Sequence, residues 1–88
     1  MPNNETAFCR VCGFEPSVPP WGMTGSDPSW EICPCCGVEY GYEDASAEGA
    51  RRYRRRWLEL GAPWSDSTVP DDGLTLDERS ARVPDAFR

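Results

Sequence analysis

Two CxxCG motifs, a low apolar content and a single helix-like Arg-rich segment predict a small metal-stabilised α+β domain. The expected architecture is two cysteine knuckles with a small antiparallel sheet, followed by one amphipathic helix and a short C-terminal helical turn. The chain has 88 residues and a formal net charge of −6, and only 13 residues are Leu, Ile, Val or Phe. So few apolar side chains make a weak core, and we therefore expect one domain, residues 1–88, with a further source of stability.

The cysteines delimit the first part of the domain, which we expect to be a metal-binding segment at residues 7–42. Residues 30–32 and 38–42 alternate apolar with polar side chains, and this pattern predicts two short strands paired as an antiparallel hairpin. Five aromatic side chains near the cysteines are expected in the core: Phe8, Phe14, Trp30, Tyr40 and Tyr42.

Two helices are expected behind this segment. Residues 46–60 contain no proline, and four apolar side chains recur there at helical spacing: Ala50, Tyr53, Trp57 and Leu60. Asp44 or Ser46 can cap this helix, and Gly61 ends it. In the tail, residues 61–88, the spacing of Thr75 and Glu78 is that of a capping box, which predicts a short helix at about 75–82.

The cysteine motifs have the spacing of a four-thiolate metal site, with twenty residues between the second and third ligand. The expected ligands are Cys9, Cys12, Cys33 and Cys36. A structural zinc contributes about 10–16 kcal/mol of apparent binding free energy, which would supply the missing stability. Disulfide pairing fits an odd number of cysteines poorly, and a redox CxxC needs a βαβ context that the sequence lacks. Cys35 is expected to be a small packed thiol, with a role as an alternate ligand left open.

The absence of two residue types excludes most enzyme classes. The chain has no His and no Lys, so it holds no Ser-His-Asp triad, HExxH zinc site, Schiff-base lysine or Walker A loop. We therefore expect a protein that is not an enzyme. No apolar run reaches the length of a signal peptide or a membrane span, and we expect a cytoplasmic protein without a membrane partner.

The cysteine motifs also carry a family resemblance. The segments CRVCGF at 9–14 and WEICPCCGV at 30–38 resemble the two knuckles of rubredoxins. From residue 8 to residue 64, the chain is more similar to the small bacterial cysteine-rich proteins named for their CPCC motif. This resemblance implies a metal-binding fold of the zinc-ribbon or rubredoxin kind and no stated activity. Glu39 stands where rubredoxins commonly have Lys, and the helix and tail have no rubredoxin counterpart.

The Arg-rich helix leaves three interpretations open. Its five arginines are Arg51, Arg52, Arg54, Arg55 and Arg56. They can form a solvated face with i,i+4 pairs to Glu48 and Glu59, they can neutralise the acidic knuckle segment, or they can bind a partner. An isoelectric point near 4.5 disfavours nucleic acid as that partner.

The function expected from these observations is that of a non-enzymatic zinc-binding small protein acting as a protein-interaction module with a protein partner. One alternative is a rubredoxin-type electron carrier with iron in place of zinc. The other is nucleic-acid binding through the Arg-rich helix.

Overall fold

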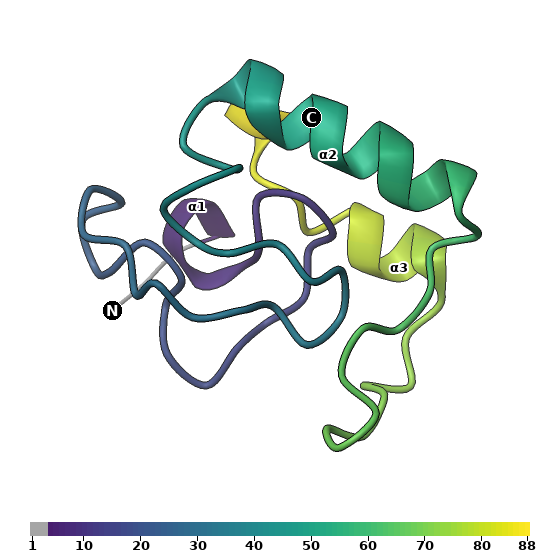
Figure 1. Ribbon diagram of the computed structural model, residues 1–88. Coiled ribbons are helices and arrows are strands. Elements are labelled where there is room, and N and C mark those ends of the chain that lie inside the picture. Colours follow the sequence, from purple (N-terminus) through teal and green to yellow (C-terminus); the bar gives the residue numbers. More distant parts are fainter. Residues whose placement is uncertain (1–3) are drawn as a thin grey trace.

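The computed structural model describes residues 4–88, in which long loops carry the cysteines and short helices pack against them (Figure 1). The helices are α1 (Asn4–Ala7), α2 (Ala47–Glu59) and α3 (Leu76–Ser80), and a 3-10 turn, η1, spans Asp85–Phe87. Helix α2 lies along one side of the cysteine-bearing loops, and η1 contacts it near the C-terminus. The C-terminal tail therefore folds back onto α2.

Helix α2 falls within the predicted residues 46–60. The side chain of Ser46 caps it by accepting a hydrogen bond from the amide of Gly49 at 3.0 Å. Ala50 and Trp57 are buried, as the apolar stripe predicted, whereas Leu60 is 67% exposed. The prediction for Leu60 is wrong because the helix ends at Glu59 and the chain turns away through a glycine with φ +91°.

Helix α3 also lies within its predicted range, and the capping box between Thr75 and Glu78 is present in both directions. The buried Arg79 pairs with Asp72 at 2.7 Å. The helix packs so closely on the first cysteine knuckle that a Cβ on Gly13 would overlap the carbonyl oxygen of Arg79. A glycine is therefore required at this contact.

The predicted antiparallel sheet is wrong: residues 4–88 contain no β-strand, and the zinc-ribbon and rubredoxin-like architectures expected for residues 7–42 are not supported. One isolated antiparallel bridge joins Ile32 to Glu39. Trp30 interrupts the first expected strand with φ +62°, and Gly41 interrupts the second with φ +101°. Backbone pairing between the two segments is therefore limited to the residues between Trp30 and Gly41. The alternation of apolar and polar side chains over three to five residues gave a single β-bridge instead of two paired strands.

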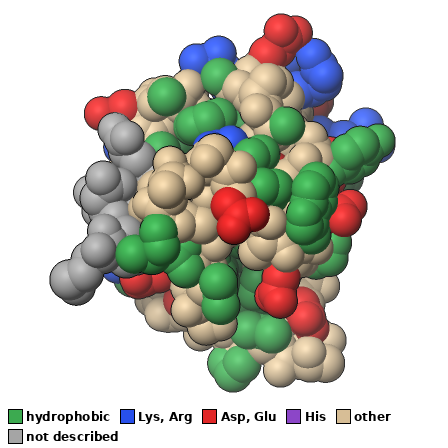
Figure 2. All heavy atoms as spheres, turned by 90° about the vertical axis from the view of Figure 1, so that its left-hand side faces the viewer, with side chains coloured by type: hydrophobic (Ala, Val, Ile, Leu, Met, Phe, Trp, Pro, Cys, Tyr) green, Lys and Arg blue, Asp and Glu red, His purple; other side chains and the backbone are tan. Residues whose placement is uncertain are grey.

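The core is built mainly around the sulfur atoms. All five cysteines are buried, and they cluster with Val11, Val38, Tyr40, Ala50 and Trp57. Tyr40 is 1% exposed, as predicted, but Trp30 and Tyr42 are 60% and 71% exposed, so placing them in the core was wrong. Figure 2 shows one face of the molecule, on which apolar and acidic side chains are interspersed.

Buried polar side chains hold the loop that separates the two cysteine motifs. The guanidinium of Arg10 lies between the rings of Trp21 and Phe87, 3.9 and 4.1 Å from their centroids. Asp44 is fully buried and accepts hydrogen bonds from Trp21 Nε1 at 2.9 Å and the Gly41 amide at 2.8 Å. Asp44 therefore ties loops together instead of capping α2.

None of the helices within residues 4–88 has the length and apolar character needed to cross a bilayer.

Candidate metal centre

The two CxxCG motifs form the same turn twice. In the first, the Gly13 amide donates to the carbonyl of Cys9 at 3.0 Å; in the second, the Gly37 amide donates to the carbonyl of Cys33 at 2.9 Å. Both glycines have φ +84°, a conformation that disfavours any residue with a Cβ. Each turn thus brings two cysteines that are three positions apart onto one side of the backbone.

The four predicted ligands come together in space. The sulfur atoms of Cys9, Cys12, Cys33 and Cys36 all lie within 4.8 Å of one another, and all four residues are buried. Two of the separations link the knuckles: Cys9 to Cys36 at 3.8 Å and Cys12 to Cys33 at 3.7 Å. A regular tetrahedron with Zn–S bonds of about 2.3 Å has edges of about 3.8 Å. The tetrad is therefore positioned to bind a metal ion.

The fifth cysteine lies outside this tetrad, as the sequence predicted. Cys35 is buried, but it is not one of the four residues whose sulfur atoms cluster. Its backbone has a different use, because the carbonyl of Cys35 accepts a hydrogen bond from the Ser65 amide at 2.9 Å. All five cysteines are free thiols, in agreement with the prediction that they form no disulfide.

Burial determines the electrostatics of the tetrad. It raises the pKa of Cys12 and Cys36, because a thiolate is poorly stabilised away from water. Burial opposes ionisation of Cys33 as well, but hydrogen bonds from the neighbouring thiols outweigh it and lower the pKa of Cys33. Four thiolates cannot share such a site unless a cation compensates their charge, and this is the chemistry of a tetrathiolate metal centre.

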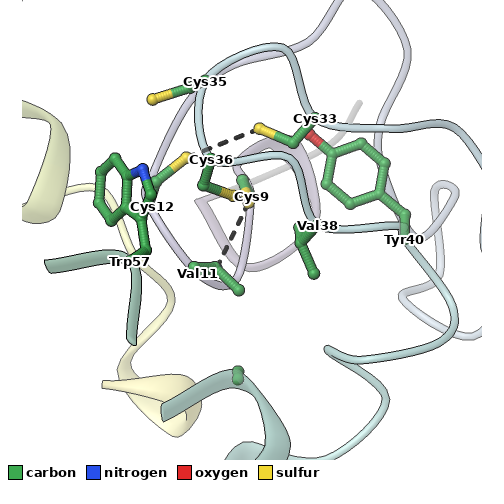
Figure 3. Packing of buried hydrophobic residues seen from close by; sticks show 10 residues of the cluster. Cys9, Val11, Cys12, Cys33, Cys35, Cys36, Val38, Tyr40 and Trp57 are labelled. Carbon is green, nitrogen blue, oxygen red and sulfur yellow. Dashed lines mark hydrogen bonds between the residues drawn. The ribbon is translucent and has the colours of Figure 1, made fainter. Parts of the chain in front are cut away.

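A buried hydroxyl supports the fit of a metal to these residues. The hydroxyl of Tyr40 faces Cys33 (Figure 3), and within residues 4–88 it has no hydrogen-bond partner of normal geometry. A thiolate held by a metal would accept from this donor. The Val11 amide already points at Cys9 Sγ at 3.4 Å, so the surroundings offer donors to the sulfur atoms.

The five arginines of α2 do not form one surface. Arg54 donates to the carbonyl oxygens of Val11, Arg10 and Phe87 at 2.6, 2.8 and 2.6 Å. It therefore joins α2 to the first knuckle and the C-terminal turn, and the sequence offered no signal that set it apart from its neighbours.

The remaining arginines of α2 are exposed. Arg52 forms the predicted i,i+4 pair with Glu48 at 2.9 Å, and Arg51 donates to the carbonyl of Arg88. Arg55 and Arg56 form no ion pair or hydrogen bond within the described residues, so the expected pair between Arg55 and Glu59 is absent. Two unpaired positive charges thus face solvent next to each other.

These two arginines border hollows along α2. One hollow, of about 390 Å³, is lined by Trp57, Leu60, Pro63 and Trp64 together with Cys36, Glu43, Tyr53, Arg56 and Ser65. The adjoining one, of about 430 Å³, is lined by Arg52, Arg55, Arg56, Glu43, Gly49, Tyr53 and Glu59. We call them together the α2 groove; its apolar end is lined by Cys36 of the tetrad, and its charged end by Arg55.

Comparison with known proteins adds one distant similarity. No family model matches the chain, and no solved structure matches it. The uncharacterized protein YoaQ of Bacillus subtilis (strain 168) is 32% identical over 68 residues, which cover 60% of this chain and 58% of that protein. The similarity thus spans little more than half of the relative and assigns no activity.

Proposed function

We propose that this protein is a non-enzymatic, zinc-stabilised interaction module of the cytoplasm. The observation that carries the proposal is the tetrad of buried sulfur atoms, with separations of 3.7 and 3.8 Å between the knuckles. The CPCC motif at 33–36 supports a relationship to the CPCC-motif proteins. A reducing compartment would keep the five cysteines as thiols and leave four of them available to a metal.

The proposed role of the ion is structural. Four thiolates complete a tetrahedral shell and leave no coordination position for water, so the site lacks what a catalytic zinc needs. The apparent binding free energy of such a site, about 10–16 kcal/mol, is as large as the whole stability of a typical domain, about 5–15 kcal/mol. We therefore expect removal of the metal to unfold the protein.

Metal analysis tests this proposal, together with a matched pair of variants. We expect one equivalent of zinc and a colourless protein; a red protein that bleaches on reduction would indicate a tetrathiolate iron site instead. Cys36→Ser should abolish stoichiometric binding and the cooperative unfolding transition, because it removes a ligand. Cys35→Ser alters an equally buried neighbour outside the tetrad and should keep both. Equal loss in the two variants would contradict the ligand assignment.

The α2 groove is the proposed interaction surface. It combines an apolar end, at Trp57 and Leu60, with two arginines that have no carboxylate partner among residues 4–88, Arg55 and Arg56. A protein segment with an apolar side chain followed by a carboxylate matches this arrangement. Arg54 is excluded from the surface because the first knuckle already uses it.

A double variant tests the groove. The probe is a labelled peptide, selected from a library, that carries an aromatic and an acidic residue. The double variant Arg55→Glu/Arg56→Glu should no longer bind this peptide, while its unfolding transition stays unchanged. Binding of single-stranded DNA that collapses with added salt would favour the nucleic-acid alternative. A peptide affinity unaltered by the charge reversal would refute the assigned surface.

A further inference from the structure

Within residues 4–88, two buried side-chain polar atoms have no hydrogen-bond partner: Arg10 Nε and the hydroxyl of Tyr40. Tyr40 is 1% exposed, and its oxygen lacks a hydrogen-bond partner of normal geometry within the part of the chain that the structure describes. Buried hydroxyls are ordinarily paired, because losing water without gaining a partner is unfavourable. An aromatic ring that only filled space here would be better supplied by phenylalanine.

The hydroxyl of Tyr40 points toward the second knuckle (Figure 3). In Figure 3 the tyrosine ring lies beside the second knuckle with its oxygen toward Cys33. Two backbone hydrogen bonds that flank the isolated bridge fix the positions of Tyr40 and Cys33. The Tyr40 amide donates to the carbonyl of Glu31 at 3.0 Å, and the Cys33 amide donates to the carbonyl of Val38 at 2.8 Å. Donor and sulfur are thus fixed by the same short pairing.

We propose that Tyr40 is a positioning residue of the metal centre, whose hydroxyl donates a hydrogen bond to Cys33 Sγ when that sulfur is a metal-bound thiolate. The inference rests on the proposed metal site and adds a group outside the four ligands. A hydrogen bond to a coordinated thiolate withdraws negative charge from the sulfur and fixes its orientation, and outer partners of this kind change metal affinity by about 10–100-fold.

The phenolic hydroxyl of a tyrosine carries its proton at neutral pH and can donate a hydrogen bond. The second tyrosine near the tetrad has another partner, because Tyr53 donates to the carbonyl of Cys36 at 3.0 Å.

The experiment compares Tyr40→Phe with Tyr42→Phe in the full chain loaded with Co²⁺. Tyr42 is 71% exposed and lies two positions away, so it controls for the loss of one hydroxyl. We expect Tyr40→Phe to bind one Co²⁺, to shift the sulfur-to-cobalt charge-transfer band to lower energy and to weaken metal affinity about 10–100-fold in chelator competition. Tyr42→Phe should match the wild type in both measurements.

The outcomes separate this inference from the proposed function. If the wild type binds Co²⁺ and Tyr40→Phe leaves both band and affinity unchanged, the role of Tyr40 is refuted while the metal site stands. A loss of thermal stability without a band shift would mean that the hydroxyl only supports packing, which also refutes it. A wild type that binds neither Co²⁺ nor zinc refutes the metal site and this inference together.

A measurement on the wild type covers the case in which Tyr40→Phe does not fold. In protein loaded with ¹¹³Cd²⁺, a hydrogen bond from Tyr40 to a coordinated sulfur should give a slowly exchanging hydroxyl proton that shows scalar coupling to the cadmium nucleus. Absence of that proton, in a sample whose metal signal is present, would overturn the proposal.

Discussion

Replacing Arg54 by glutamine removes a guanidinium that donates to three backbone carbonyls, two of them in the first cysteine knuckle. A net contribution of about 1.5–3 kcal/mol for each hydrogen bond to a charged group would sum to well over 4 kcal/mol. The three bonds share one side chain that is only partly buried, so the carbonyls regain some hydration when it is lost. We therefore expect a loss of about 2–4 kcal/mol in the free energy of unfolding.

The assay is urea or thermal unfolding in saturating zinc, with Arg55→Gln as the control. Arg55 is adjacent, exposed and without an ion pair or hydrogen bond within the described residues, so its replacement should change the stability by no more than about 0.5 kcal/mol. A loss of 2 kcal/mol corresponds to a decrease in Tm of about 8–16 °C for a domain of this size. Equal stability of the two variants would refute the assignment of Arg54 as the residue that joins α2 to the knuckle.

Two further predictions concern the contact between α3 and the rest of the chain. Gly13→Ala should lower the free energy of unfolding by about 2–4 kcal/mol, because φ is +84° and the methyl group would overlap the carbonyl of Arg79. The control is Gly73→Ala, where φ is +77° but the space around the glycine is open. It should lower the free energy of unfolding by only about 1 kcal/mol in the same assay. Asp72→Asn should lose about 1–3 kcal/mol and Asp71→Asn less than about 0.5 kcal/mol, since only Asp72 pairs closely with the buried Arg79. Hydrogen bonds from Arg79 lower the pKa of Asp72 in the folded protein. The carboxylate therefore contributes fully to stability above the pKa of an unfolded Asp, which is near 3.9. The difference in the free energy of unfolding between the wild type and Asp72→Asn should thus stay constant from pH 8 to pH 5. Equal effects of Gly13→Ala and Gly73→Ala would contradict the close contact between Gly13 and Arg79. Equal effects of Asp72→Asn and Asp71→Asn, or an effect of Asp72→Asn that disappears between pH 8 and pH 5, would contradict the pairing of Asp72 with Arg79.

The residues that could be predicted are those whose roles depend on local spacing. Cys9 and Cys12 are close because a tight turn with a following glycine brings them together, whatever the rest of the chain does. The caps at Ser46 and Thr75 are likewise formed by neighbours three positions apart. The expected strand at 30–32 failed because alternation is weak information over three residues, and nothing in it revealed the positive φ of Trp30.

Side chains that act across the fold could not be assigned in advance. Arg54 has the same charge as its neighbours, and its role follows from the loops that fold back onto one side of α2. Tyr40 was expected in the core as an aromatic ring, but the direction of its hydroxyl depends on the pairing of two segments around the second knuckle. Both roles require knowledge of which distant backbone lies beside a given side chain.

The order of residues by itself determined the four thiols, their pairing into two turns, and the position and caps of α2 and α3, because these follow from contacts over three or four residues. Only the tertiary structure decided that the second turn carries one bridge in place of a sheet, which arginine binds the backbone of the first knuckle, and which tyrosine hydroxyl lies beside Cys33 (Figure 3). The reason is physical: burial and orientation arise from packing of segments that are distant in the chain, and local patterns carry no record of that packing.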